Sequence, residues 1–206
     1  VTAVLENNER VIGQASTQSL AAFTGITPVS GSAFPALGGA APVLSSAGVV
    51  LTLDATAGNQ HRLRGFSVGN AATDIAGTGF GTLDVAEVTL TGTGMALNLN
   101  TGALVGGFSG VTSTASSGQG LALQNISTSG TFGFGGTSIS GSTTQGLLVS
   151  NSPANLDFGA TVVNVERPGG GDTTRAMGFP DPADETGTSL FWKLIGRNKC
   201  CVVVDR

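Results

Sequence analysis

The stretch Leu83-Asp-Val-Ala-Glu-Val-Thr-Leu90 spaces its apolar side chains two, three and two residues apart. The same spacing, with mostly apolar residues, recurs elsewhere in the chain. The copies occupy residues 61–68, 83–90, 106–113, 132–139 and 156–163. Successive side chains of a strand point to opposite faces, so a spacing of two is typical of β-strands with one buried face.

A second short alternating segment precedes each copy. It occupies residues 51–53, 73–75, 95–97, 121–123 and 147–149, in steps of 22, 22, 26 and 26 residues. Two markers that advance together indicate an internal repeat. Helical repeats are excluded because their apolar residues recur every 3.6 residues, not every two. A propeller blade needs about 40 residues per repeat, whereas one coil of a parallel β-helix fits a repeat of this length. The sequence therefore predicts an all-β, single-domain parallel β-helix, or solenoid, of about five coils of 22–26 residues each.

The repeat divides the chain into three parts. Residues 1–48 are predicted to cap the N-terminal end, residues 49–165 to form the coils, and residues 166–206 to form a C-terminal cap or an appended tail. The tail differs in composition, because it holds twelve charged residues whereas none occurs between Val88 and Leu156. Both open ends of a solenoid expose strand edges, so self-association through the ends is a further expectation.

Within the tail, two segments have recognisable patterns. Residues 189–196 are predicted as a short helix that begins after Ser189 and would lay Phe191, Trp192 and Ile195 over the last coil. Residues 200–204 are predicted as a strand. Cys200 and Cys201 are adjacent and cannot easily close an unstrained disulfide.

Stacked coils would place equivalent residues above one another at about 4.8 Å. Asn125 and Asn151 would then form an amide ladder at a turn. An interior column is predicted from Val85, Phe108, Phe134 and Phe158, where ring contacts add to burial.

Charged residues of the first coils also fall into columns. Arg62 is equivalent to Asp84, and Arg64 comes close to Glu87, which predicts ion pairs between coils worth about 0–1 kcal/mol each. The alternative is that Arg62 and Arg64 form a basic pair that contacts a ligand. His61, the single histidine, is expected to pack inward near the N-terminal cap rather than to act as a base.

A glycan-cleaving enzyme is one alternative function, because glycosidic cleavage usually needs two carboxylates about 5–10 Å apart. Asp74, Asp84 and Glu87 are the catalytic candidates for that alternative. The leading expectation is that the chain has no catalytic residues. No spacing typical of a metal site occurs, and neither a metal nor a cofactor is expected.

Rows of hydroxyl groups suggest a second alternative, ice binding. Outward positions beside the second strand would form two parallel rows in stacked coils, a geometry able to order water. The candidates are Thr89, Thr91, Thr112, Thr114, Ser138 and Ser140. Serine and threonine also fill solvent-facing strand positions for no functional reason, which a Thr-rich composition favours.

Overall charge excludes some partners. The net charge of −4 argues against nucleic acid, which requires a basic face. The longest apolar runs are shorter than the roughly 20 residues that span a bilayer, so no transmembrane segment is expected in this chain.

Four segments carry a resemblance to a known family. They are Arg10-Val-Ile-Gly-Gln14, Leu63-Arg-Gly-Phe-Ser-Val-Gly-Asn70, Ile75-Ala-Gly-Thr-Gly-Phe-Gly-Thr-Leu83 and Thr91-Gly-Thr-Gly-Met-Ala-Leu-Asn-Leu99. They resemble the repeats of bacterial right-handed parallel β-helix surface proteins, over residues 10–165. The resemblance implies a right-handed solenoid that is secreted or displayed on a bacterial surface, as an adhesin-like or autotransporter-passenger-like module. It defines no catalytic residues.

These observations together favour a non-enzymatic extracellular scaffold. Its flat faces are expected to contact glycan, host or cell-surface molecules, or neighbouring copies.

Overall fold

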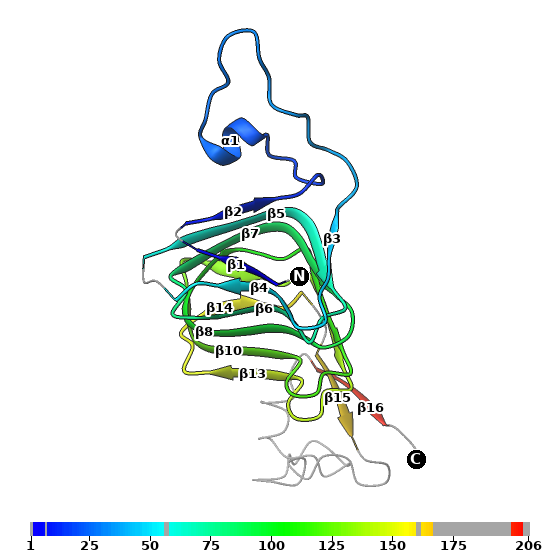
Figure 1. Cartoon of the computed structure of the whole chain (residues 1–206). Coiled ribbons are helices and arrows are strands. Elements are labelled where there is room, and N and C mark those ends of the chain that lie inside the picture. Colours follow the sequence, from blue (N-terminus) through cyan, green and yellow to red (C-terminus); the bar gives the residue numbers. More distant parts are fainter. Residues whose placement is uncertain (1, 7, 56–57, 160–161, 167–198, 204–206) are drawn as a thin grey trace, which may run out of the picture. The chain divides into compact units, whose positions relative to one another are not determined.

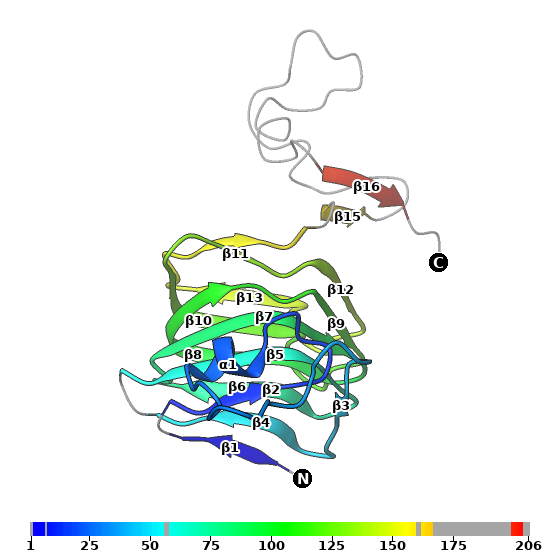
Figure 2. The same ribbon diagram turned by 90° about the horizontal axis from the view of Figure 1, so that it is seen from above.

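The computed structural model describes residues 2–6, 8–55, 58–159, 162–166 and 199–203. The chain divides into two compact units, Val1–Gly159 and Ala160–Arg206. The first unit is a parallel β-solenoid of about five turns, which confirms the predicted fold class. Figure 1 shows its strands in side view, and Figure 2 shows the same unit after a 90° rotation.

One wall of the solenoid is a stack of parallel strands (Figure 1). In spatial order they are β1 (Ala3–Leu5), β4 (Val49–Leu53), β6 (Thr73–Thr78), β8 (Met95–Gly106), β10 (Leu121–Thr128) and β13 (Leu147–Ser150). Alternate residues face the interior. Leu51, Ile75, Leu97 and Leu121 form one buried column, each no more than 1% exposed.

A second wall turns away from the first at the long strands. It contains β2 (Arg10–Ile12), β5 (Gln60–Gly69), β7 (Thr82–Thr91), β9 (Gly110–Thr114) and β12 (Gly136–Ser140). Strand β8 joins the walls, because its first half pairs with β6 and its second half with β7. The remaining pairs add β3 (Val43–Leu44) beside β5, and β11 (Thr131–Gly133) beside β14 (Asn155–Asp157).

Residues in the left-handed backbone region bend the chain between strands. Thr101, Asn125 and Asn151 have φ values of 61°, 53° and 47° at equivalent corners of successive coils. Asparagine tolerates this conformation better than most residues. The corner therefore explains the Asn residues that the sequence places there.

Aromatic side chains fill the interior of the later coils. The ring centroids of Phe108 and Phe134 are 6.2 Å apart, and those of Phe134 and Phe158 are stacked at 4.5 Å. Phe132 packs edge-on against Phe134 at 5.1 Å. The structure thus brings together the three phenylalanines of the predicted column. Val85 is buried but pairs with Gly106, so it does not stand below Phe108 as predicted.

The predicted register is wrong by two residues at three places. On the first wall, Leu51 pairs with Ile75 rather than with Thr73, and Leu97 rather than Met95 pairs with Leu121. On the second wall, Leu83 pairs with Leu104 instead of Gly106. A shift of two leaves every side chain on the same face, so the hydrophobic alternation is satisfied by both registers.

The N-terminal segment contributes strands to the first coil and one short helix. Residues 3–5, 10–12 and 43–44 form β1, β2 and β3, which pair with β4 and β5. Helix α1 (Leu20–Thr24) lies between β2 and β3 and was not predicted. Ser19 caps its N-terminus by accepting a hydrogen bond from the Ala22 amide, and Gly25 follows its C-terminus with φ of 76°.

The second unit contains two described strands. β15 (Val162–Glu166) pairs in parallel with β16 (Lys199–Val203), which is the strand predicted over residues 200–204. The predicted helix 189–196, with Phe191, Trp192 and Ile195, lies outside the described residues.

Candidate functional site

A shallow groove crosses the outer face of the first wall. Its volume is about 370 Å³. It is lined by Val4, Thr52, Leu53, Asp54, Ala55, Ala76, Gly77, Thr78 and Asn98. These residues come from β1, β4, β6 and β8 and the turn after β4, so four successive strands build the groove.

The groove exists because of one short side chain. Val4, Thr52, Ala76 and Asn98 are register partners on neighbouring strands and point outward. Ala76 stands between two longer residues of this column and leaves the floor low.

The chemistry of the groove suits a polyhydroxylated ligand. Thr52 and Thr78 offer hydroxyl groups, Asn98 offers an amide, and Asp54 offers a carboxylate. Val4, which is 52% exposed, adds an apolar surface at one end. Hydrogen-bonding groups beside a small apolar surface match the hydroxyl groups and C–H faces of a sugar ring.

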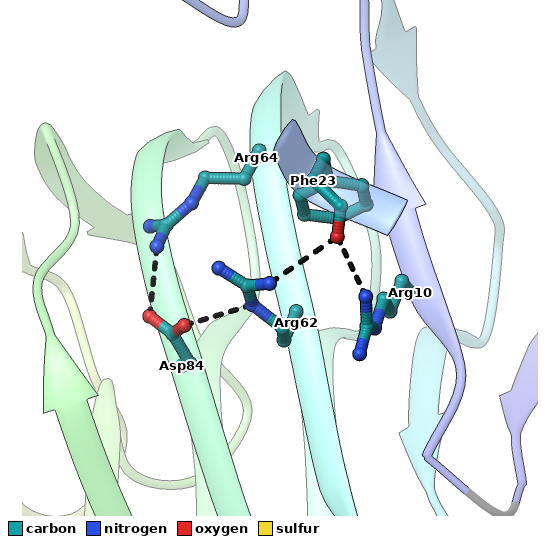
Figure 3. Close-up of polar contacts among 5 residues, drawn as sticks. All are labelled: Arg10, Phe23, Arg62, Arg64 and Asp84. Carbon is teal, nitrogen blue, oxygen red and sulfur yellow. Dashed lines mark hydrogen bonds and ion pairs between the residues drawn. The ribbon is translucent and has the colours of Figure 1, made fainter. Parts of the chain in front are cut away.

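A cluster of charged residues lies on the outer face of the second wall (Figure 3). Arg62 Nε lies 3.0 Å from Asp84 Oδ2, and Arg64 Nη2 lies 2.9 Å from Asp84 Oδ1. The Arg62–Asp84 pair is the predicted one. The predicted partner of Arg64 was Glu87. The structure gives the ion pair of Arg64 to Asp84, and the charge of Arg64 is a minor cause of the lowered pKa of Glu87.

The same cluster holds helix α1 in place. Arg10 and Arg62 both donate hydrogen bonds to the Phe23 carbonyl oxygen, at 2.6 and 3.3 Å. The Arg62 guanidinium also lies 5.1 Å from the centre of the Phe23 ring. Cations at a helix C-terminus satisfy its last carbonyl groups. The arginines are therefore engaged by the protein itself (Figure 3).

The three candidate catalytic acids have different surroundings. Asp74 is 2% exposed on β6, and burial raises the pKa of its carboxyl group to about 7. Asp84 is held by the two arginines. Glu87 accepts hydrogen bonds from the backbone amide and the hydroxyl of Thr17, and the hydroxyl contact is the main cause that lowers the pKa of Glu87. None of the three lines the groove over β1, β4, β6 and β8.

His61 faces the interior of the first coil and is fully buried. Its burial lowers the pKa of the imidazole, an effect opposed by Asp54 and Glu9. Within the described residues, no group of three or more His, Cys, Asp and Glu side chains is placed to hold a metal ion. No helix of the described part is long and apolar enough to cross a membrane.

The hydroxyl rows are continuous over two of the strands. Thr112 pairs with Ser138, and Thr114 with Ser140, between β9 and β12. These pairings match the predicted rows.

The rows continue to β7 in a register shifted by two residues from the predicted one, so that Thr91 lies beside Thr112. Thr89 pairs with Gly110, not with Thr112, and Thr93 rather than Thr91 forms the bridge to Thr114. The displacement is again two residues.

Two of the hydroxyl groups form hydrogen bonds between coils. Thr91 Oγ1 donates to the Val68 carbonyl at 3.4 Å, and Thr114 Oγ1 donates to the Gly92 carbonyl at 3.0 Å. These hydroxyls thus contribute to the cohesion of neighbouring coils.

The asparagine ladder is present and extends by one residue. Asn151 Nδ2 donates to Asn125 Oδ1 at 2.6 Å, and Asn125 Nδ2 donates to Asn100 Oδ1 at 2.7 Å. The amides follow one corner of the solenoid across three coils.

Sequence reasoning missed the groove. The predicted register would have set Thr52 beside Asp74, whereas the structure sets it beside Ala76. In the correct register, the outward residues Thr52, Ala76 and Asn98 form one column with a small central member, and this pattern is the signal that could have found the groove.

Comparison with known proteins adds one partial match. Residues 154–206 match the CoA-transferase family III. The match starts just before β14 and includes the whole second unit. No curated protein and no solved structure matches the chain significantly. Because the matched residues are a minority of the chain, the match assigns no family to the solenoid.

Proposed function

We propose that the chain is a non-enzymatic, secreted or bacterial cell-surface scaffold whose first solenoid wall binds glycan. The groove over β1, β4, β6 and β8 is the observation that carries this proposal. It combines hydroxyl, amide and carboxylate groups with an exposed valine on a rigid sheet face.

Rigidity of the groove supports the proposal. Apart from Asp54 and Ala55, its lining residues stand on strands whose inward residues, including Leu51, Ile75 and Leu97, are buried in the core. A preorganised site loses little conformational entropy on binding, which matters for weakly bound sugars. Such a scaffold would present the same surface whether it stands alone or beside neighbouring copies.

A glycan array probed with the full chain tests the proposal. We expect binding to at least one glycan class, and we expect Ala76→Leu to abolish it by filling the floor of the groove. Ser138→Leu is the matched control, since it adds a leucine to an exposed outward position on β12, away from the groove.

Two results would contradict the proposal. Binding that survives Ala76→Leu would place the site elsewhere, and the absence of any binding would remove the glycan function. Release of reducing ends or unsaturated product from a bound glycan would instead identify a glycan-cleaving enzyme.

A further inference from the structure

The last coil of the solenoid ends in a strand with one open edge. Among the described residues, β13 pairs with β10 and with no other strand (Figure 1). Leu147 and Val149 continue two inward columns of the core, and their partners on β10 are fully buried. Leu147 and Val149 are nevertheless 40% and 42% exposed, because no further coil of the described part covers them. The described coils thus end in apolar surface beside a strand edge.

The hydrogen bonds to β10 decide which backbone groups of β13 face the open edge. The Leu121 amide donates to the Gly146 carbonyl at 2.9 Å, and the groups that bond one neighbour alternate along each strand of a parallel ladder. The amide and carbonyl of Leu148 therefore face β10. Those of Leu147 and Val149 face the open edge, where they offer two donors and two acceptors.

The two ends of the solenoid differ in charge. At the N-terminal end, Glu6 and Glu9 lie between β1 and β2, and β2 begins with Arg10. Charged residues at strand edges discourage pairing with another chain. Strand β13 lies in the long uncharged stretch of the sequence and contains neither a charged residue nor a proline. Its edge therefore lacks the residues that usually protect an edge strand.

We infer that two copies of the chain pair through β13 in an antiparallel, two-fold symmetric dimer. Antiparallel pairing centred on Leu148 sets Leu147 of one copy opposite Val149 of the other. These two residues then exchange amide and carbonyl hydrogen bonds, and the symmetry repeats the exchange. All four outward groups are satisfied in this register. The inward side chains of the two copies also cover one another, which removes apolar surface from water.

A second copy of the same end fits this edge better than the opposite end does. A two-fold contact requires a self-complementary surface, and the uncharged β13 carries no group that repels its own copy. Contact with the opposite end would bring β13 against Glu6, Glu9 and Arg10, and would continue into a fibre. The described strands of the second unit, β15 and β16, pair with each other.

Sedimentation velocity of the full chain tests the dimer. We expect a monomer–dimer equilibrium in which the dimer is populated at about 100 µM chain. Val149→Lys sets a charge against the apolar surface of the second copy and should raise the dimer dissociation constant at least about ten-fold. Ser150→Lys is the matched control. It adds the same charge to an exposed position on the outer face of β13 and should change the constant less than about three-fold.

Disulfide cross-linking tests the orientation, in chains whose Cys200 and Cys201 are replaced by serine. The two copies of Leu148 would face each other across the symmetry axis with their Cα atoms about 4.5 Å apart, a distance that a disulfide spans. Oxidised glutathione should therefore convert Leu148→Cys to a covalent dimer. Ser150→Cys is the matched control, because its two copies would lie about 13 Å apart along the strands and should not be linked.

Four results would overturn the inference. They are a chain that stays monomeric at about 100 µM, a dimer that Val149→Lys leaves intact, cross-linking that is no greater in Leu148→Cys than in Ser150→Cys, and assemblies larger than a dimer. If Val149→Lys does not fold, the mass of the wild-type chain and the two cysteine variants decide. None of these results bears on the glycan proposal.

Discussion

The early and the late coils of the solenoid are held together by different side chains. Between β5 and β7, Arg62 and Arg64 bind Asp84 across neighbouring coils. Uncharged contacts join the later coils. They are the stacked rings of Phe134 and Phe158 and the amide ladder of Asn125 and Asn151. The backbone pairing is parallel in both regions.

The same parallel backbone pairing is thus compatible with different kinds of side-chain contact between coils. Charged residues occur where an added segment must be held, since the arginines also bind helix α1 through the Phe23 carbonyl. The late coils have no such insertion and rely on apolar burial and amide bonds. Stability of the early coils should therefore respond to salt and pH, and that of the late coils should not.

Removing the central aromatic ring of the late coils has the largest expected effect. Phe134 is fully buried, so Phe134→Ala should lower the free energy of unfolding by about 3–5 kcal/mol in urea titrations. Phe158→Ala, at the half-buried end of the stack, should cost less. Equal losses at the two positions would show that the stack is not centred on Phe134.

The buried acid of the early coils should make stability depend on pH. The pKa of Asp74 is raised to about 7 in the folded chain, so the folded state holds the proton more tightly than the unfolded state. The contribution of Asp74 to the free energy of unfolding is therefore fully present below about pH 4 and is lost as the pH rises to about 7. The difference is up to about 4 kcal/mol. His61, whose pKa is lowered, acts in the opposite sense and destabilises the fold in acid.

Asp74→Asn isolates the first effect. Relative to the wild-type chain, the variant should gain stability between pH 4 and pH 8 in urea titrations at fixed salt. A constant difference between the two proteins across this range would contradict the assignment to Asp74.

The smallest effect is expected at the ion pairs, and it should depend on salt. Arg62→Ala removes a partly exposed ion pair and a helix contact, and should cost about 1 kcal/mol at low salt and less at 1 M NaCl. Asn125→Ala, which loses two amide bonds and carries a positive φ, should cost a similar or larger amount at both salt concentrations. A loss of stability in Arg62→Ala that is the same at low and high salt would mean that packing against Phe23, rather than the ion pair, dominates.

The amino-acid sequence was sufficient for the fold class and for several contacts. The spacing of the repeat predicted the parallel solenoid, the Arg62–Asp84 pair, and the Asn125–Asn151 ladder seen in the structure. Helix α1 was missed because five residues show too little periodicity to be recognised. The groove was missed because its residues are distant in sequence and meet only in the correct register.

Alternation of apolar and polar residues by itself determined which side chains face the interior of this protein, and hence that its segments stack as coils. Tertiary structure alone decided which coil residue lies beside which, including Ile75 beside Leu51 and Ala76 beside Thr52. The physical reason is that side chains alternate with a period of two. A slip of two residues preserves burial, and only the turns, the packing of particular rings and the hydrogen bonds between coils distinguish the registers.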